Sequence, residues 1–297
     1  MLGEAVKSAS IICPVYKMAG KLQLFEEWVG KLSSNPQIEI IVVNDYSNEA
    51  TSSELNAICQ RYDNLKFIEG NFGNPGSARN AGLEICQGKW VTFWDSDDEP
   101  DVENFLALLK SIELTNLDIC FGRYKIFNET SHRISESPAW SSNTDRDLSI
   151  LAQNPGIWRI IFTRKLIEGI RFEALRMAED QIFICEAILK ARNFMFTNNQ
   201  IYTYFTGSTN HLTKNSAALQ DLLPAFKKTI EILKTSDVAV APFLSLMAAK
   251  QLISGGRYGN MRTRFGLIVV FFKARLFVIP TFLNALRAVI QTSVRGA

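Results

Sequence analysis

Residues 90–98, WVTFWDSDD, join a short apolar run to an acidic turn. A run of this length, rich in aromatic and β-branched residues, predicts a buried β-strand over residues 90–95. Three carboxylates, Asp95, Asp97 and Asp98, stand where that strand ends. We therefore interpret the rest of the N-terminal part by comparing it with this buried strand and the acidic turn that follows it.

Similar apolar runs recur on both sides of this strand and alternate with longer segments of helical spacing, which is typical of a parallel sheet with crossover helices. Further strands are predicted at residues 10–15, 39–44, 65–69 and 117–121. A helix with one apolar face is predicted between Leu22 and Leu32. Asp101 is placed to cap a second helix that ends near Leu114. The first 121 residues therefore predict an α/β fold.

The chain after residue 121 is less regular. Residues 128–155 are polar and predict a long loop. Residues 158–170 fit a strand or a helix, and residues 178–191 predict a helix. From about residue 216 the pattern is mostly helical.

Composition and charge restrict the class of protein. With 47% hydrophobic and 21% charged residues among 297, the chain is neither disordered, collagenous nor a disulfide framework. The formal charge of +2 divides unevenly. Residues 238–297 carry eight basic and no acidic side chains, whereas the first 237 residues carry 24 basic and 30 acidic ones. An acidic body thus precedes a basic tail.

The five cysteines are widely spaced within apolar runs, which indicates buried thiols of a cytosolic protein rather than a zinc or disulfide site. The first ten residues include Glu4 and have no long apolar stretch, so we expect no signal peptide. The two histidines, His132 and His211, lie in polar stretches and give no support for a catalytic triad or a histidine metal site.

Polar side chains follow three of the predicted strands: Pro14 and Tyr16 after the first, Asn44 and Asp45 after the second, and the acidic turn after the fourth. Ligands bind at the carboxyl ends of the strands in open parallel sheets. Carboxylates gathered there repel one another unless a cation or a proton intervenes. Mg²⁺ and Mn²⁺ take oxygen ligands and bridge substrate phosphates, so we expect Mn²⁺ or Mg²⁺ at this edge.

Two familiar phosphate-binding signatures are missing. The chain has no GxGxxG after its first strand and no GxxxxGKS, which argues against a dinucleotide dehydrogenase and a P-loop NTPase. A glycine-rich bend over residues 70–76 instead leads into a helix that bears Arg79. Loop geometry alone explains such glycines, and contact with a diphosphate is the alternative.

Five runs of this sequence, in this order and spacing, resemble glycosyltransferase family 2, the inverting enzymes of the GT-A fold. The runs are residues 10–16, 38–47, 76–82, 92–98 and 157–183. The resemblance covers roughly residues 8–206.

The resemblance implies an α/β fold of the GT-A nucleotide-diphospho-sugar transferase type, a mixed and mainly parallel sheet with flanking helices. The glycosyltransferase domain would occupy residues 1–215, with a donor half at 8–121 and an acceptor half at 122–215. Residues 216–297 would form a helical, basic C-terminal region.

The resemblance also assigns roles on the donor side. Asp97 matches the family's metal ligand, and Asp95 matches a contact to the donor ribose or to the metal. A divalent cation on the diphosphate lowers the barrier to its departure. The alternative for these carboxylates is a polar turn with a helix cap. Arg79 would orient the diphosphate.

By the same match, Asp45 faces the nucleotide base, and Pro14 and Tyr16 lie along it. A side chain that caps its own turn is the alternative for Asp45. The family commonly has Asp-Asp-Gly-Ser where residues 44–47 of this chain read NDYS. One carboxylate and one glycine of that pattern are therefore replaced.

On the acceptor side, Asp180 resembles the family's general base, which would accept the proton of an acceptor hydroxyl as that oxygen attacks the anomeric carbon. Neighbours on a helix differ by about 100°, so Glu179 would point elsewhere. The alternative for Asp180 is an acid in the first turn of a helix. Trp158 could stack on an acceptor sugar or pack in the core.

Residues 257–297, the C-terminal part of the basic tail, have two interpretations. Residues 265–286 are apolar but interrupted by two basic residues and by Pro280, so they miss the ~18 uncharged residues of a spanning helix. On a helical wheel Arg264 and Arg275 fall nearly opposite the cluster of Arg262, Lys273 and Arg287, so no clean stripe results. Charge and apolar content favour contact with an anionic membrane surface. A helical hairpin packed on the body or on a partner subunit is the alternative.

Together these features predict an inverting, metal-dependent hexosyltransferase that moves a sugar from a nucleotide-diphosphate donor, a UDP-sugar by family habit, to a hydroxyl of a bacterial surface glycan or glycolipid. No nucleic-acid partner is expected. We expect a cytoplasmic protein, peripheral on the inner face of the cell membrane. The alternative is a catalytically inactive subunit that binds a nucleotide sugar or docks in a glycan-synthesis complex. A sugar nucleotidyltransferase would need a glycine-rich N-terminal loop with Arg and Lys, and none follows Ile12.

Overall fold

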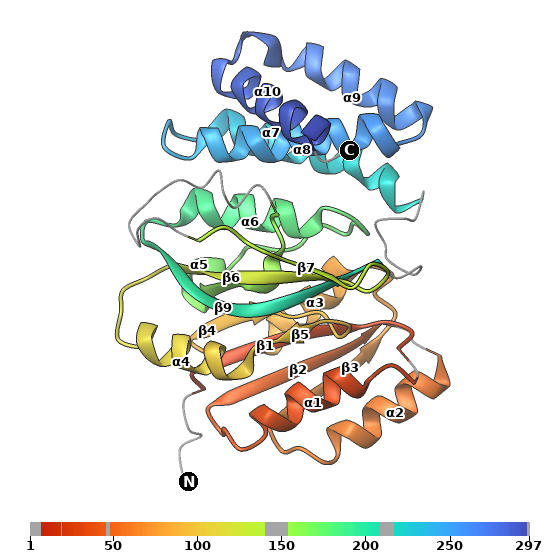
Figure 1. Cartoon of the computed structure of the whole chain (residues 1–297), viewed down its shortest axis with the longest axis vertical. Helices are drawn as coiled ribbons and strands as arrows, with labels where there is room; N and C mark the ends of the chain where they lie inside the picture. The colour runs from red at the N-terminus through yellow and green to blue at the C-terminus, as the bar shows by residue number, and fades with distance from the viewer. Residues whose placement is uncertain (1–6, 19, 46–47, 140–153, 208–216, 296–297) are drawn as a thin grey trace. The chain divides into compact units, whose positions relative to one another are not determined.

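A computed structural model describes residues 7–18, 20–45, 48–139, 154–207 and 217–295. The chain forms two compact units. The sheet unit comprises residues 1–145, 156–171 and 191–208, and the helical unit comprises residues 146–155, 172–190 and 209–297. Figure 1 shows that the described strands lie in the first unit and that the described part of the second consists of helices and connecting segments.

The sheet unit is built on a nine-stranded sheet of order β3-β2-β1-β4-β8-β6-β9-β5, with β7 paired to β6. The strands are β1 (Ala9–Val15), β2 (Ile38–Asp45), β3 (Leu65–Gly70), β4 (Trp90–Phe93), β5 (Glu99–Pro100), β6 (Ile119–Asn128), β7 (Arg133–Glu136), β8 (Ile160–Thr163) and β9 (Phe194–Thr206). The first four strands pair in parallel, as do β6 and β9, and the other pairs are antiparallel. The predicted α/β class with a mixed sheet is confirmed.

The helices of the sheet unit follow the predicted apolar spacing. They are α1 (Gln23–Leu32), α2 (Glu49–Cys59), α3 (Pro75–Ile85), α4 (Val102–Ile112), the 3₁₀ turn η2 (Ile157–Arg159) and the short α5 (Arg164–Ile167). In α1, Phe25, Trp28 and Leu32 are buried because positions three and four apart share one face. Asp101 caps α4 as predicted, its carboxylate accepting from the backbone N of Asn104 at 3.0 Å.

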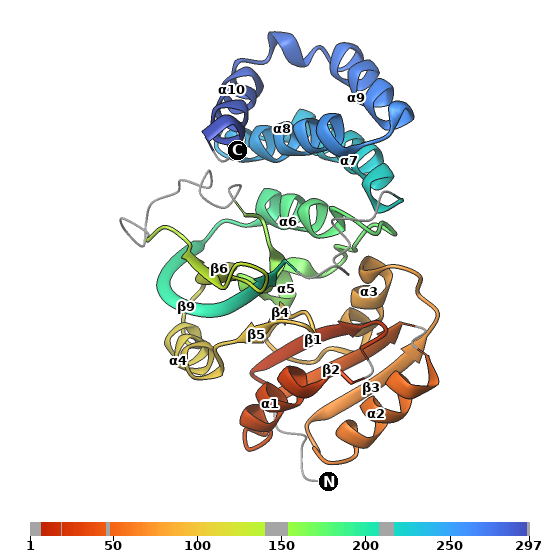
Figure 2. The same ribbon diagram turned by 45° about the vertical axis from the view of Figure 1, so that its right-hand side comes forward.

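The helical unit contains long helices with short connections, best seen in Figure 2. Its elements are α6 (Glu179–Lys190), η4 (Ala218–Asp221), α7 (Leu222–Thr235), α8 (Ala241–Tyr258), α9 (Met261–Lys273), η5 (Leu276–Val278) and α10 (Pro280–Arg295). The helix α8 packs against both α7 and α10, and its Leu244, Met247 and Ala248 are fully buried. Within the part of the chain that the structure describes, none of the helices is long and apolar enough to cross a membrane.

One prediction about the middle of the chain needs correction. The long loop predicted at residues 128–155 is wrong at its start, because β6 and β7 form a hairpin in which Lys125 pairs with Glu136. Cross-strand pairing with β6 makes a strand of residues 133–136, whose side chains are all exposed and include a single apolar residue, Ile134, too few for a strand pattern. Residues 140–153 of the same stretch lie outside the described residues.

The two units interleave along the chain. Residues 172–190, with α6, group with the C-terminal helices, although they precede the last strand of the sheet. The C-terminal helices predicted after residue 216 are present over the described residues. The domain boundary at 215/216 stays a prediction.

Candidate active site

The predicted donor-side residues follow three adjacent strands. The strand β1 lies between β2 and β4, with Val15 opposite Asn44 and Ile12 opposite Phe93. All three strands run in parallel, so their carboxyl ends share one edge of the sheet. This edge carries Pro14 and Tyr16 at the end of β1, Asp45 as the last residue of β2, and the acidic turn after β4.

The carboxylates of the acidic turn differ in exposure. Asp97 is exposed and Asp95 is half-buried, whereas Asp98 is 1% exposed. Asp98 accepts hydrogen bonds from the Tyr202 hydroxyl at 3.0 Å and from the backbone N of Phe205 at 2.8 Å. The Tyr202 oxygen in turn accepts from the backbone N of Asp95 at 3.0 Å. One phenol thus links the two ends of the turn, which leaves the Asp97 side chain on the outside.

The electrostatics confirm that these carboxylates crowd one another. Burial raises the pKa of Asp98 well above its usual range, and the charges of Asp95 and Asp97 raise it further. The pKa of the Cys13 thiol on β1 is raised by burial and then by the charges of the same turn. The predicted crowding of carboxylates at this edge is therefore present in the structure, and either a cation or a proton on one carboxylate offsets the repulsion.

Arg79 supplies part of that positive charge. Its side chain is 6% exposed and one guanidinium nitrogen lies 2.9 Å from Asp95 Oδ1. The helix α3 that carries it starts with Pro75, and the Asn74 side chain caps it by accepting from the backbone N of Ser77 at 2.8 Å. The structure thus brings Arg79 to the acidic turn.

Asp45 is 7% exposed and is held by a neighbouring loop. Its Oδ1 accepts from the backbone N of Phe72 at 2.7 Å and of Gly73 at 2.8 Å. Gly73 has a φ of +73°, a left-handed conformation that glycine adopts without strain. The carboxylate therefore shapes the glycine-rich bend. Residues 46–47 of its own turn lie outside the described residues, and its contact with a nucleotide base stays a prediction.

Asn44, which stands where the family commonly has Asp, has a structural position in this chain. Its side-chain amide donates to Ser52 Oγ and to Glu69 Oε2, both at 2.7 Å, and so ties β2 to α2 and β3. Tyr46, the second departure from the family pattern, lies outside the described residues.

Tyr16 and Pro14 border the same edge. Tyr16 is 55% exposed, and the Lys17 ammonium lies 4.9 Å from the centre of its ring. Pro14 is half-buried. An exposed aromatic ring at the end of β1 is chemically suited to lie along a nucleotide base, and this role stays a prediction.

Asp180 belongs to the helical unit, in the first turn of α6. Its Oδ1 accepts from the backbone N of Gln181 at 2.8 Å. Glu179 is buried and Asp180 is half-buried, in line with the expectation that the two neighbours point in different directions. Ala178 just before them has a φ of +64°, a strained conformation for a residue with a Cβ. The role of Asp180 as general base stays a prediction.

Trp158 packs in the core. It is 4% exposed and stacks on the rings of Tyr202 and Tyr204, with centroids 4.7 and 5.4 Å away. Of the two interpretations of Trp158, the structure favours core packing, because almost no ring surface is left for a sugar.

Sequence reasoning missed Tyr202 and Phe205, which hold the acidic turn from β9. They stand more than 100 residues after Asp98 and belong to no motif. The available signal was the alternation of Tyr202 and Tyr204, which places both rings on one face of a strand. That signal shows burial and does not show which turn the hydroxyl contacts.

A metal ion would bind at the acidic turn. Among the residues that the structure describes, no cluster of three or more His, Cys, Asp or Glu side chains is arranged to hold a metal by itself. Asp97 and Asp95 offer two carboxylates at the edge of the sheet. Mg²⁺ and Mn²⁺ fit such a set, because hard cations of this kind take one or two carboxylates, waters and the phosphate oxygens of a substrate.

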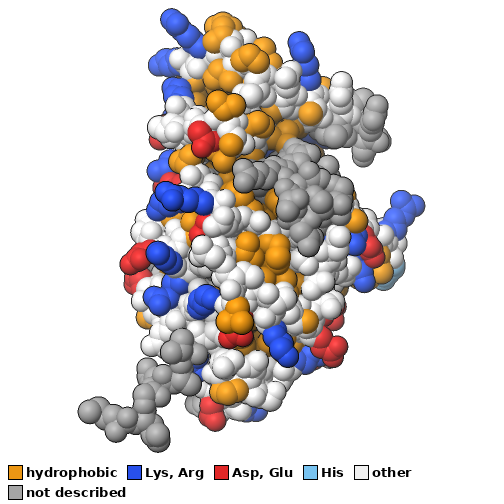
Figure 3. Space-filling view, turned by 90° about the vertical axis from the view of Figure 1, so that its left-hand side faces the viewer, with side chains coloured by type: hydrophobic (Ala, Val, Ile, Leu, Met, Phe, Trp, Pro, Cys, Tyr) orange, Lys and Arg blue, Asp and Glu red, His pale blue; other side chains and the backbone are white. Residues whose placement is uncertain are grey.

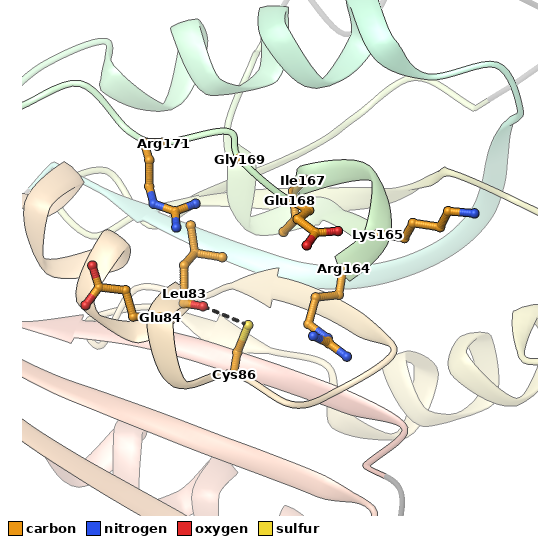
Figure 4. A pocket seen from close by; sticks show the side chains of 9 residues that line it. All are labelled: Leu83, Glu84, Cys86, Arg164, Lys165, Ile167, Glu168, Gly169 and Arg171. Carbon is orange, nitrogen blue, oxygen red and sulfur yellow. Dashed lines mark hydrogen bonds between the residues drawn. The ribbon is translucent and has the colours of Figure 1, made fainter.

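A cavity of about 400 Å³ lies elsewhere on the sheet unit (Figure 4). It is lined by Leu83, Glu84, Cys86, Arg164, Lys165, Ile167, Glu168, Gly169 and Arg171. The Cys86 thiol there donates to the carbonyl oxygen of Leu83 at 3.3 Å. Because the cavity adjoins the last turns of α3 and none of the predicted site residues lines it, we regard it as separate from the acidic turn.

Comparisons with known proteins bear on the family and the fold of the chain. The family model described as glycosyl transferase family 2 matches residues 10–175. Over 247 residues the chain is 28% identical to poly(ribitol-phosphate) beta-glucosyltransferase of Bacillus spizizenii. This alignment covers 80% of this chain and 39% of that protein. The chain spans only 30% and 47% of the length of two further curated relatives.

Solved structures share the fold. The crystal structure of S. aureus TarS 1–349 in complex with UDP-GlcNAc superimposes with a TM-score of 0.69 at 22% identity, covering 96% of this chain and 81% of that one. The mannosyltransferase PcManGT of Pyrobaculum calidifontis, in complex with GDP-Man and Mn²⁺, gives a TM-score of 0.53 at 14% identity, covering 96% and 87%. The predicted GT-A fold is confirmed.

Proposed function

Because the chain belongs to glycosyl transferase family 2, we propose that it transfers a sugar from a UDP-sugar to a hydroxyl of a bacterial surface glycan, with inversion at the anomeric carbon. The observation that carries this proposal is the acidic turn, where Asp97 is exposed while Asp95 and Asp98 are held by fixed partners. The beta-glucosyltransferase among its relatives and the UDP-GlcNAc complex of TarS support the donor and the reaction class.

Asp97, with Asp95, would hold Mn²⁺ or Mg²⁺ on the donor side. A divalent cation supplies positive charge to the diphosphate as it leaves, which lowers the barrier electrostatically. The Mn²⁺ in the PcManGT complex supports this choice of ion. The residues fit the ion because both are oxygen donors at the end of β4.

The other donor-side residues orient the nucleotide. Arg79 is fixed by its ion pair with Asp95 and brings a buried cation to the site of the diphosphate. Asp45 and Tyr16 lie at the ends of the next two strands, where the base would bind. Because these groups are positioned before the donor arrives, little free energy is spent on ordering them.

The acceptor hydroxyl would give its proton to Asp180. A carboxylate is a weak base for an alcohol, so the proton moves late, after the oxygen has begun to bond to the anomeric carbon. A position in the first turn of α6 favours the ionised carboxylate, since the helix N-terminus carries partial positive charge.

The test is donor-dependent release of UDP from a panel of UDP-, GDP- and CDP-sugars with Mn²⁺. We expect release with a UDP-sugar, and we expect Asp180→Asn to lower it about 100-fold or more while UDP still raises the melting temperature. The matched control is Asp63→Asn, an exposed carboxylate on the sheet unit, which should behave like the wild type. Full activity of Asp180→Asn would show that this carboxylate is not the base.

The catalytically inactive subunit is the less supported reading. Its sequence argument was the pair of departures at Asn44 and Tyr46, and Asn44 serves to join strands and a helix. Asp95, Asp97 and Asp180, to which we assign the metal and base roles, are all present in the chain. Binding of UDP without turnover of any donor in the panel would favour the inactive subunit.

The basic region, residues 257–297, would contact an anionic membrane surface, which would bring the enzyme to lipid-linked acceptors at the inner face of the cell membrane. The charge of the tail supports this location, because all of its side chains that are charged at neutral pH are basic.

A further inference from the structure

The helix α9 shows an apolar stripe to solvent. Met261, Phe265, Ile268 and Phe272 are 79%, 69%, 52% and 60% exposed. Their spacing of four, three and four residues places them within about 60° of one another around the helix. Thr263 and Leu267, on the opposite side, are buried, since α9 packs against α7 and α8. One side of α9 thus packs against α7 and α8. Its other side is an apolar face that no described residue covers.

The stripe continues past the end of the helix. Phe277 and Val278 in η5 are 46% and 62% exposed. The ring of Phe277 lies 6.1 Å from that of Phe272 and 6.4 Å from that of Phe271. We call this set the α9 surface: Met261, Phe265, Ile268, Phe272, Phe277 and Val278. Figure 3 shows hydrophobic and basic side chains together over the C-terminal helices.

Basic side chains flank the α9 surface. At about 100° per residue, Arg262 and Lys273 fall on one side of the stripe and Arg264 on the other. Arg275 follows directly, at the turn into η5. On the helical wheel these basic residues formed no single stripe. In the structure they border the exposed apolar face from both sides. No acidic residue occurs between residues 238 and 297.

We propose that the α9 surface inserts into the headgroup region of an anionic bilayer, with α9 in the membrane plane and its flanking arginines and lysine on lipid phosphates. With 13 residues the helix is about 20 Å long, which is too short to cross the hydrocarbon core. Long basic side chains reach phosphates while their apolar stems stay buried. The proposal rests on the membrane contact proposed above and does not depend on the transfer reaction.

A bilayer fits this face better than a second copy of the chain. In a two-fold dimer the same patch would face itself, so Arg262, Lys273 and Arg275 would oppose one another. The tail holds no carboxylate that would offset the repulsion. An anionic bilayer offers apolar depth for the rings and negative charge for both flanks.

The experiment is flotation of the full chain with vesicles of phosphatidylcholine alone or mixed with phosphatidylglycerol. We expect binding to the anionic vesicles at least tenfold stronger than to the neutral ones. Phe265→Ser with Phe272→Ser should lower the partition coefficient about tenfold or more for each ring. The matched control replaces two exposed apolar residues of the sheet unit, Leu114→Ser with Ile134→Ser, and should leave binding unchanged.

The charge is tested separately. Arg262→Glu with Lys273→Glu should abolish the preference for anionic vesicles, and Lys31→Glu with Lys110→Glu, two exposed lysines of the sheet unit, should keep it. All variants change exposed side chains, and thermal unfolding checks that each is folded. Wild-type protein that fails to bind anionic vesicles, or a double Phe variant that binds like the wild type, would overturn the proposal.

Two further readouts separate the possible failures. Self-association that the double Phe variant abolishes, without vesicle binding, would assign the α9 surface to a second copy and overturn the bilayer. UDP release from a soluble donor, measured without vesicles, should be equal in the wild type and the double Phe variant. Vesicle binding by a protein that releases no UDP would count against the proposed function alone.

Discussion

Carboxylates are buried at both ends of the central sheet, and they are held for different purposes. At the amino end Glu39, 1% exposed, accepts hydrogen bonds from Ser10 Oγ and from the backbone N of Gln87 and of Gly88. Lys66 adds an ion pair at 2.7 Å. These partners all belong to the sheet unit, so the Glu39 carboxylate holds β1, β2 and the loop after α3 together.

At the carboxyl end Asp98 is equally buried and accepts two hydrogen bonds, but its neighbour Asp97 is exposed. The fixed partners of Asp95 and Asp98 set the path of the turn and so determine where Asp97 projects. Burial of a carboxylate therefore does not by itself mark a functional residue. The informative feature is an exposed carboxylate whose neighbours are locked in place.

The largest expected effect is a loss of activity when a carboxylate is removed at the carboxyl end of the sheet. Asp97→Asn should lower UDP release about 1,000-fold, or about 4 kcal/mol of transition-state energy, because the donor's cation loses a charged ligand. Its free energy of unfolding should stay within about 0.5 kcal/mol of the wild type, since the side chain is exposed. Steady-state kinetics and urea unfolding measure the two quantities, with Asp63→Asn as control. A variant that keeps its activity would remove Asp97 from the site.

The second prediction concerns the amino end. Glu39→Ala should lower the free energy of unfolding by about 3 kcal/mol, because one hydroxyl and two backbone N–H groups lose a buried acceptor. Activity per folded molecule should remain that of the wild type. Urea unfolding together with kinetics at low temperature tests both halves. A selective loss of activity would contradict the division between the two ends.

The third prediction tests the link behind the acidic turn. Tyr202→Phe keeps the ring that stacks on Trp158 and removes the hydroxyl between Asp95 and Asp98. We expect a loss of about 1–2 kcal/mol in the free energy of unfolding. We also expect KM for the donor to rise more than kcat falls, since Tyr202 is a positioning residue that does not touch the reacting atoms. The control is Tyr204→Phe, which also stacks on Trp158; an equal change in KM there would contradict the assignment.

The smallest effect is one of pH. Burial alone would raise the pKa of Glu39, but hydrogen bonds from Lys66, Ser10 and Gln87 outweigh it and hold that pKa below its ordinary value. The folded state therefore binds this proton less readily than the unfolded state does. The stabilisation from Glu39 is complete above its ordinary pKa and is lost as the pH falls through the lowered value.

Urea unfolding of the wild type and of Glu39→Gln at several pH values measures this effect. We expect the difference in the free energy of unfolding between the two proteins to shrink as the solution becomes more acidic. A difference that is constant with pH would show that the carboxylate charge contributes nothing there.

The parts that could be predicted from the sequence depend on local patterns. The strands that end in Asp45 and Asp95, and the cap at Asp101, follow from periodicity and from residue types within a few positions. The partners of these residues could not be found that way. Asp45 binds a loop 27 residues away, and Asp98 binds Tyr202 at a separation of 104, so the contacts exist only once the sheet has formed.

The basic tail illustrates the same limit. Its charged and apolar residues could be counted from the sequence. Whether the basic side chains lie on one face of α9 or on both sides of an apolar face depends on which side of the helix packs against its neighbours. The burial of Thr263 and Leu267 decides this, and it is set by α7 and α8. A helical wheel has no information about that contact.

The source of Tyr202 and Phe205 in β9 has a consequence for how the chain is made. The ribosome releases the acidic turn first and the strand that holds it more than 100 residues later. At 5–20 residues per second, the interval is about 5 to 20 s. During that time the carboxylates of a nascent chain crowd together without the phenol and the amide that fix them. A fragment that stops before β9 contains every donor-side motif residue but lacks the phenol and the amide that bind the acidic turn.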